Sequence, residues 1–373
     1  MKVKFVTDEL KKRLSQLGSV VAKKAAQPVY SFVRLYALES EGKYTVGMQG
    51  VDIDATLAVQ FTGAEADGAV DILLPYAKLV DILGGVSAKE STIEAADETK
   101  ATFKSGKYRA ELKAHPLENW PAPIERPESS VATVALPGFK AQIANVEFAV
   151  PPSDGKHVVA VVKVESTAEK LRLVATDGFR LAISDVPGNA GEFNLILPKP
   201  ALELLKKLEG GQLTISEAEA GFYFDTELET LTVSRSYGEF PNYSVVIPKS
   251  SKTVITVEKG ALAESVKRTK PLADPERPKI RFGVEENGAS LVLEAIYDEA
   301  GTDGGTFRNM ASDDIDAKVT GPAVGFALDA NLLQPFIDQA TGPIEIRVNT
   351  AQGVIDFGAA NGERPLQMPR REK

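Results

Sequence analysis

The chain has 373 residues, and its 43 Lys and Arg side chains stand against 52 Asp and Glu, which gives a formal net charge of −9. This acidic balance excludes a uniformly basic protein that coats nucleic acid. The length predicts two or three domains, each large enough for its own core. The absence of cysteine excludes disulfides, thiol nucleophiles and thiolate metal sites, and leaves His115 and His157 as the only imidazoles.

The N-terminus carries no secretion signal of the usual kind. Residues 1–8 contain two lysines followed almost directly by an acid, with no apolar segment and no small-residue cleavage site. The longest apolar runs, such as 158–164, are far shorter than the roughly 20 residues that cross a bilayer. We therefore expect a protein that is neither secreted nor membrane-spanning.

An internal repeat is the most informative feature of the sequence. Residues 197–215 align without a gap on residues 328–346, at an offset of 131 positions, and residues 74–85 form a third, looser copy. Each copy predicts a strand, a short amphipathic helix, a stop at glycine and a second strand, because the apolar spacing changes from helical to alternating. An apolar i, i+4 pair also recurs near the start of each unit and predicts a second helix, as in Leu10 and Leu14.

The repeat and its linkers predict three α+β domains in tandem. An aromatic residue followed by proline recurs at Trp120 and Phe240, and proline-rich segments follow both. Short alternating runs between the predicted helices suit half-buried antiparallel strands. The resulting boundaries are 1–124, 125–250 and 251–373.

Charge is unevenly distributed between predicted helices and predicted strands. Residues 1–24 carry seven basic side chains against two acids, whereas residues 285–317 carry nine acids and one base, Arg308. The plain interpretation is a set of solvated polar faces. If the basic helices share one surface, that surface could instead hold a polyanion weakly, without sequence preference and with strong salt dependence.

Two acidic groups invite a catalytic or metal-binding interpretation. Asp52 and Asp54 would lie on one face of a strand, which is typical of a solvated surface as well as of paired carboxylates. Asp313, Asp314 and Asp316 lack the glycine and the distal glutamate of a calcium loop, so a solvated loop is favoured there. No phosphate-binding glycine loop occurs.

Three motifs in this order resemble one known family. They are Val174-Ala-Thr-Asp-Gly-Phe-Arg-Leu-Ala, Phe240-Pro-Asn-Tyr-Ser-Val-Val-Ile-Pro and the terminal Met368-Pro-Arg, set in three repeats over the whole chain. Together they resemble the bacterial sliding clamps, the beta subunits of DNA polymerase III. Gly50-Val-Asp-Ile-Asp is similar to a first-domain element of that family, with Val51 in place of its usual threonine.

The resemblance implies both an architecture and a function. It implies an α+β fold of three tandem DNA-clamp repeats, with antiparallel sheets outside and two helices per domain inside. Two copies would join head to tail into a homodimeric ring that encircles double-stranded DNA without sequence specificity. The clamp would act in the cytoplasm in DNA replication as a processivity factor, with no catalysis, cofactor or metal.

The resemblance also implies the binding positions. Gln-Leu-x-Leu-Phe-type peptides of the polymerase III alpha subunit, the clamp loader and repair polymerases would enter a groove between the second and third domains. The groove positions are Val159, Thr176, Gly178, Phe179, Arg180, Leu181, Pro241, Val245, Val246, Leu366, Met368, Pro369 and Arg370. The DNA-facing candidates are Lys11, Lys12, Lys24, Lys140, Lys206, Lys207, Lys267 and Arg268, and the dimer contacts are Ala110, Leu112 and Leu272.

Two other classes of function remain as alternatives. A tandem-repeat scaffold or adhesion protein would use the acidic strands to bind other proteins and would be monomeric. A hydrolase built on Asp52 and Asp54 is less well supported, because no histidine, serine or metal ligand clusters near them in the sequence.

Overall fold

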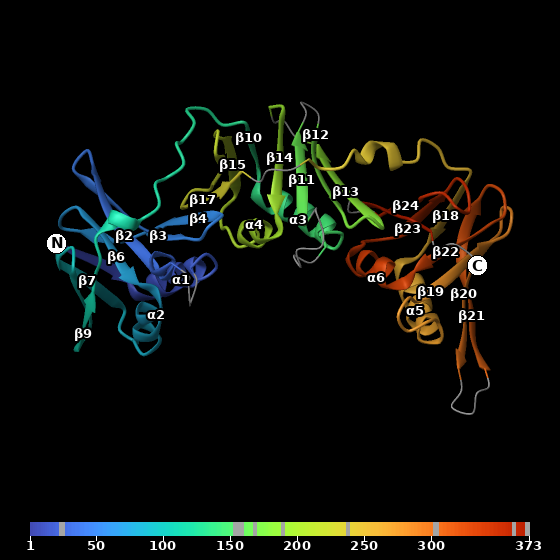
Figure 1. The fold of residues 1–373 in the computed structure, drawn as a ribbon, viewed down its shortest axis with the longest axis horizontal. Helices are drawn as coiled ribbons and strands as arrows, with labels where there is room; N and C mark the ends of the chain where they lie inside the picture. Colours follow the sequence, from blue (N-terminus) through green and yellow to red (C-terminus); the bar gives the residue numbers. More distant parts are fainter. Residues whose placement is uncertain are drawn as a thin grey trace. The chain divides into compact units, whose positions relative to one another are not determined.

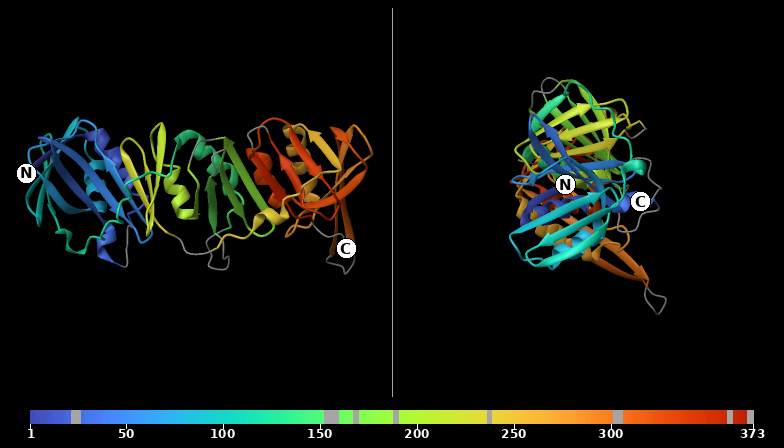
Figure 2. Two further views of the ribbon diagram at one scale, coloured as in Figure 1. Left: turned by 90° about the horizontal axis from the view of Figure 1, so that it is seen from above. Right: turned by 90° about the vertical axis from the view of Figure 1, so that its left-hand side faces the viewer.

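The computed structural model describes residues 1–21, 27–151, 160–166, 170–187, 191–235, 239–300, 306–359 and 363–369. The chain forms two compact units (Figures 1 and 2). Unit 1 comprises residues 1–140, 189–191 and 200–237, and unit 2 comprises residues 141–188, 192–199 and 238–373. Each unit is described by itself below.

Unit 1 contains two antiparallel sheets and the helices that pack on them. The five-stranded sheet has the order β5-β1-β7-β8-β9, and the eight-stranded sheet has the order β10-β15-β16-β17-β4-β3-β2-β6. The strands of the first sheet are β1 (Lys2–Val6), β5 (Glu65–Ala66), β7 (Glu90–Asp97), β8 (Lys100–Ser105) and β9 (Tyr108–Lys113). Those of the second are β2 (Phe32–Ser40), β3 (Lys43–Val51), β4 (Ala55–Gln60), β6 (Val70–Pro75), β10 (Ala132–Ala135), β15 (Gln212–Glu217), β16 (Gly221–Asp225) and β17 (Glu229–Ser234).

Among its described residues, unit 1 has two α-helices, each with a buried apolar stripe, and two short 3-10 helices. They are α1 (Thr7–Leu17), α2 (Tyr76–Gly84), η1 (Pro28–Ser31) and η2 (Leu117–Asn119). In α1 the buried positions Leu10, Leu14 and Leu17 recur at the spacing of one helix face. Two further helices join the units in sequence, namely α3 (Leu136–Glu147) and α4 (Lys199–Leu205).

Unit 2 is built on one twelve-stranded sheet. Its order is β14-β11-β12-β13-β25-β24-β23-β18-β21-β20-β19-β22. The strands are β11 (Val161–Ser166), β12 (Lys170–Thr176), β13 (Arg180–Pro187), β14 (Phe193–Pro198), β18 (Thr253–Val257), β19 (Lys279–Val284), β20 (Ser290–Ala300), β21 (Thr306–Thr320), β22 (Val324–Asp329), β23 (Ile344–Val348), β24 (Ile355–Gly358) and β25 (Glu363–Gln367). The helices are α5 (Lys259–Thr269), α6 (Ala330–Gln339), η3 (Tyr243–Val246) and η4 (Lys270–Leu272).

The order of elements repeats three times along the chain. Each repeat begins with a strand followed directly by a helix. The helix begins four residues after one residue of that strand, and this residue is Val3 in the first repeat, Ala132 in the second and Ile255 in the third. Each of these residues pairs with an isoleucine of a later strand, Ile93, Ile215 or Ile346. The last two are the residues that the 131-position offset aligned, so the sequence repeat corresponds to a structural one. The fold is α+β with antiparallel sheets, as expected.

The domain bounds 1–124, 125–250 and 251–373 stay a prediction. The eight-stranded sheet joins β4 to β17, and the twelve-stranded sheet joins β13 to β25, so continuous sheets cross both predicted boundaries. The compact units therefore divide the chain within the predicted middle domain rather than at its edges.

Two sequence expectations about acidic residues were wrong. Asp52 and Asp54 lie in the exposed turn between β3 and β4 rather than on one face of a strand. Asp313, Asp314 and Asp316 lie within β21 rather than in a loop, because their segment pairs with β20 along its length. No helix among the described residues is both long and apolar enough to cross a bilayer.

Candidate functional site: an apolar groove in unit 2

The tight turn between β12 and β13 forms one wall of the groove. Gly178 has φ of +86°, a conformation that side-chain-bearing residues rarely adopt. The Asp177 carboxylate accepts hydrogen bonds from the backbone N–H of Phe179 at 3.0 Å and of Arg180 at 2.9 Å. The Thr176 hydroxyl donates to the Arg180 carbonyl oxygen at 2.8 Å. The turn is therefore held by its own side chains, as Asx turns are.

Arg180 holds the turn to the rest of unit 2. Its guanidinium donates from Nε to Asp177 Oδ2 at 2.9 Å and from Nη1 to the Leu332 carbonyl oxygen of α6 at 2.9 Å. It also lies 5.3 Å from the ring centroid of Phe148. Since Asp177 pairs with its charge and two of its donors have partners within unit 2, Arg180 is held in place and shapes the groove.

The groove itself is a hollow of about 220 Å³ with an apolar floor. Leu181 of β13 pairs with Leu366 of β25, and both are buried beside Val174 and Tyr243. Met368 is bound to the turn through its N–H, which donates to the Phe179 carbonyl oxygen at 3.0 Å. The residues that line the hollow are Thr176, Gly178, Phe179, Arg180, Leu181, Pro241, Asn242, Tyr243, Val246, Val354, Leu366 and Met368.

A polar cluster lies below the Tyr243 ring. The Tyr243 hydroxyl donates to Glu165, which also forms an ion pair with Lys163 at 2.7 Å. Burial raises the pKa of Tyr243 to about 12, and the hydrogen bond to Glu165 acts in the same direction. Burial also acts to raise the pKa of Glu165, but the hydrogen bonds from Lys163 and Tyr243 outweigh it and lower that pKa. The phenol is thus neutral and fixed in place under the groove.

The structure brings nine of the thirteen expected groove residues to this hollow. They are Thr176, Gly178, Phe179, Arg180, Leu181, Pro241, Val246, Leu366 and Met368. Val245 is 75% exposed and does not line the hollow, while Pro369 lines an adjoining hollow of about 610 Å³ that shares Phe179 and Met368. Val159 and Arg370 lie outside the described residues.

Sequence reasoning missed three lining residues, Asn242, Tyr243 and Val354. Asn242 and Tyr243 are part of the Phe240-Pro motif, so the motif itself was the available signal. No signal in the sequence pointed to Val354, because this residue reaches the groove only through the pairing of β24 with β25.

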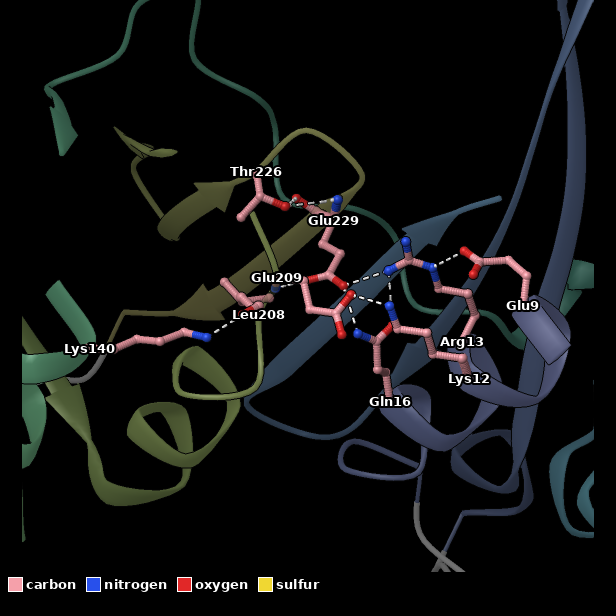
Figure 3. Close-up of polar contacts among 9 residues, drawn as sticks. All are labelled: Glu9, Lys12, Arg13, Gln16, Lys140, Leu208, Glu209, Thr226 and Glu229. Carbon is pink, nitrogen blue, oxygen red and sulfur yellow. Dashed lines mark hydrogen bonds and ion pairs between the residues drawn. The ribbon is translucent and has the colours of Figure 1, made fainter. Parts of the chain in front are cut away.

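A buried polar network lies apart from the groove, in unit 1 (Figure 3). Arg13 of α1 is 2% exposed and donates to Glu229 of β17 at 2.6 Å and to Glu9 at 2.8 Å. Gln16 donates to the same Glu229 oxygen at 2.8 Å, and the Glu209 N–H donates to its other oxygen at 2.7 Å. Burial raises the pKa of Glu229, and the Glu209 N–H and the Arg13 charge oppose that shift. One sequence signal pointed to this network: Arg13 follows Leu10 by three residues and so falls on the apolar face of α1.

Most of the predicted DNA-facing cations contact their own unit. Lys12 pairs with Glu209 at 2.6 Å, and Arg268 pairs with Asp313 at 2.7 Å. Lys11 and Lys140 donate to backbone carbonyl oxygens of Val86 and Leu208. The other four are Lys206, which pairs with Glu203, the exposed Lys207 and Lys267, and Lys24, which lies outside the described residues.

The predicted dimer residues lie on two separate elements. Ala110 and Leu112 belong to β9 in unit 1, where Leu112 is buried and Ala110 is partly exposed. Leu272 belongs to η4 in unit 2 and is 38% exposed. Among the described residues, no group of three or more His, Asp or Glu side chains could hold a metal ion.

Known proteins share both the central segment and the fold of this chain. A family model of the DNA polymerase III beta subunit, central domain, matches residues 133–242. The chain is 26% identical over 281 residues to the beta sliding clamp of Pseudomonas putida, which covers 74% of this chain and 76% of that protein. It is 24% identical over 357 residues to the clamp of Caulobacter vibrioides, at 92% and 91% coverage.

Solved structures match over the full length. The sliding clamp of Bacillus subtilis superposes with a TM-score of 0.87 at 18% identity, covering 100% of both chains. The clamp of Pseudomonas aeruginosa in its complex with griselimycin gives 0.85 at 22% identity, again at full coverage. These likenesses define the DNA-clamp fold. Residues 133–242 thus match the central domain of the DNA polymerase III beta subunit, and the curated relatives are beta sliding clamps, which confirms the resemblance seen in the sequence.

Proposed function

We propose that the protein is a DNA sliding clamp, a ring-shaped homodimer that acts in the cytoplasm during replication. It would encircle duplex DNA without reading its sequence and without catalysing a reaction. Partners would be tethered through the apolar groove of unit 2. Such a ring holds DNA by topology, so a net charge of −9 and cations already paired within the protein are compatible with it.

The groove geometry carries the partner-binding part of this proposal. The groove has an apolar floor made by Leu181, Leu366 and Tyr243. The flexible side chain of Met368 and the aromatic ring of Phe179 partly cover this floor and are 48% and 59% exposed. A short peptide with leucine and phenylalanine side chains would bury these surfaces. The small volume of about 220 Å³ fits two or three apolar side chains rather than a folded domain. We therefore propose peptides of the Gln-Leu-x-Leu-Phe type as ligands, contributed by the polymerase III alpha subunit, the clamp loader and repair polymerases.

A labelled Gln-Leu-x-Leu-Phe peptide tests the groove by fluorescence anisotropy. The expected dissociation constant is micromolar, because five residues bury limited apolar area at roughly 25 cal/mol per Å². Met368→Ala should weaken binding about ten-fold, since it removes a thioether side chain from the groove wall. Met310→Ala is the matched control, because Met310 is also exposed but lies on β21, outside the groove. Equal affinities of the two variants would contradict the proposed site.

A further inference from the structure

A second hollow, in unit 1, is lined by strands and by the chain segment that begins with Trp120 and Pro121. Its volume is about 330 Å³, against about 220 Å³ for the groove. One side consists mainly of residues of β3, β4 and β17, and the other side consists of the segment 120–126. Pro241, from the second aromatic residue followed by proline, lines the groove in the same way. The two hollows therefore use equivalent parts of the repeat.

The hairpin of β3 and β4 has the same length as the hairpin of β12 and β13. The last pair before the turn is Val51 with Thr56 in the first hairpin and Thr176 with Leu181 in the second, so four residues form each turn. In both turns the N–H of an aspartate donates to the carbonyl oxygen three residues later, at 2.8 Å in unit 1 and at 3.4 Å beside the groove. Thr56 is therefore the counterpart of Leu181.

These two counterparts join their hairpins to a later strand in the same way. Thr56 pairs with Thr232 of β17, and Leu181 pairs with Leu366 of β25. All four residues line their respective hollows. The groove thus has a leucine pair at the place where the hollow of unit 1 has a threonine pair.

A backbone hydrogen bond closes both junctions at the same place. In unit 1 the N–H of Ser234 donates to the carbonyl oxygen of Asp54 at 2.9 Å. At the groove the N–H of Met368 donates to the carbonyl oxygen of Phe179 at 3.0 Å. Ser234 and Met368 each stand two residues after the paired threonine or leucine, and each lines its hollow. Unit 1 therefore repeats the backbone of the groove with side chains of different chemistry.

Hydroxyl groups replace apolar side chains in the hollow of unit 1, which we call the polar hollow. The three partly exposed residues that stand in place of Leu181, Leu366 and Met368 are Thr56, Thr232 and Ser234. A leucine or phenylalanine side chain placed here would cover hydroxyl groups without offering them a hydrogen bond, which is unfavourable.

Two side-chain hydrogen bonds fix the segment 120–126 to the sheet. The Trp120 indole N–H donates to Gln49 Oε1 of β3 at 3.2 Å. The Tyr223 hydroxyl of β16 donates to the Ile124 carbonyl oxygen. Strands β4 and β17 lie between β3 and β16 in the sheet, so the segment is attached on both sides of the threonine pair. The polar hollow is therefore formed before any ligand binds, which lowers the entropic cost of binding.

The charged side chains of the polar hollow already have partners within unit 1. Arg34 donates to both carboxylate oxygens of Asp71 at 2.7 Å, and Arg126 donates to Asp225. Asp52 is exposed at the turn, and its Oδ1 accepts the N–H of the next residue at 2.8 Å. A ligand would therefore meet mainly hydroxyl and amide groups, which favours uncharged polar side chains.

We propose that the polar hollow is a second peptide-binding site, which takes an extended segment of a partner protein with amide or hydroxyl side chains. This inference rests on the proposed peptide binding by the groove, whose backbone geometry the polar hollow repeats. Glutamine and asparagine side chains carry both donors and acceptors, so they can pair with the hydroxyls of Thr56 and Thr232. The two sites of one chain would then select partner segments of opposite polarity.

Trp120 reports on the polar hollow, because it lines this hollow, does not line the groove and is the only tryptophan of the chain. The probe is the unlabelled acetylated peptide Gln-Asn-Ser-Asn-Gln, titrated into the protein while Trp120 fluorescence is followed. We expect a saturable change with a dissociation constant of about 0.1–1 mM, weaker than at the groove because each new hydrogen bond replaces one to water. No saturable change up to about 10 mM would overturn the proposal.

Removal of the two threonine hydroxyls tests the specificity of the site. Thr56→Val with Thr232→Val keeps the shape of both side chains and should weaken binding of this probe at least about ten-fold. The matched control is Thr133→Val with Thr214→Val, a second cross-strand threonine pair of the same sheet that lies outside the polar hollow. This control should change the dissociation constant less than about two-fold. Equal effects of the two double variants would overturn the assignment of the site.

The Gln-Leu-x-Leu-Phe peptide separates this inference from the proposed function. At concentrations that saturate the groove in the anisotropy measurement, the unlabelled peptide should leave Trp120 fluorescence unchanged, because its apolar side chains cannot pair with the threonine hydroxyls. An equal Trp120 response to both peptides would overturn the polar preference. A polar probe without effect, while the groove binds its own peptide, contradicts this inference alone, whereas a groove that binds no peptide contradicts the proposed function.

Discussion

At the scale of single residues, Arg13 is one of the two buried charged residues among the described residues of unit 1, the other being Glu229. It is buried beside Glu229, with which it forms an ion pair. Its guanidinium also donates hydrogen bonds to the carboxylate of Glu9 and to the amide oxygen of Gln16. A buried pair of this kind contributes little net stability over apolar residues, but loss of one partner leaves a charge without compensation. The pair therefore restricts which side chains are tolerated at positions 13 and 229, but it adds little to the total stability.

We predict that Arg13→Met lowers the free energy of unfolding by about 3–5 kcal/mol, because Glu229 is left buried without its cation. Adding Glu229→Gln in the same chain should recover at least half of the loss. The measurement is urea unfolding followed by circular dichroism, which reports the strands of both units, together with the fluorescence of Trp120, the only tryptophan, which lies in unit 1.

The control for this prediction is the ion pair of Arg308 with Asp298. Its Nε to Oδ1 distance is 2.7 Å, but the side chains are 68% and 47% exposed. Arg308→Met should therefore cost less than about 1 kcal/mol. A loss from Arg13→Met no larger than that of Arg308→Met would show that burial does not govern the Arg13 pair.

At the scale of elements, the turn between β12 and β13 positions the groove. Gly178 combines a φ of +86° with open space around the position of a Cβ atom, so only backbone conformation disfavours a side chain there. Phe179 follows directly, and its carbonyl oxygen holds Met368. Any relaxation of Gly178 is therefore transmitted to both exposed walls of the groove.

Gly178→Ala should destabilise unit 2 by about 1–2 kcal/mol and should also weaken peptide binding, since the turn would relax away from the left-handed conformation. Gly138→Ala is the control: Gly138 lies in α3 with open space around it, and alanine there should stabilise by roughly 0.5–1 kcal/mol without changing peptide affinity. Thermal unfolding and peptide anisotropy of both variants give the answer. An unchanged affinity in Gly178→Ala would show that the groove does not depend on this turn.

At the scale of the whole molecule, the oligomeric state separates the proposed clamp from a tandem-repeat scaffold. Gel filtration with light scattering should give a mass of roughly 80 kDa, twice the 40.0 kDa of one chain, because the proposed ring consists of two copies. A mass near 40 kDa at micromolar concentration would favour the scaffold alternative.

The sequence by itself determined the repeat, the α+β class and most of the groove. The offset of 131 residues was visible because each repeat buries the same strand and helix positions, and the groove motifs were contiguous along the chain. Local patterns of this kind follow from burial on one face, which a linear sequence records directly.

Only the tertiary structure decided which distant residues meet. It placed Val354 in the groove, paired Arg13 with Glu229 and turned the predicted acidic loop at Asp313 into a strand. It also joined strands across both predicted domain boundaries, so that compact units and sequence repeats do not coincide. The physical reason is that strand pairing is a contact between segments far apart in sequence, and a strand's own residues do not specify which edge it will fill.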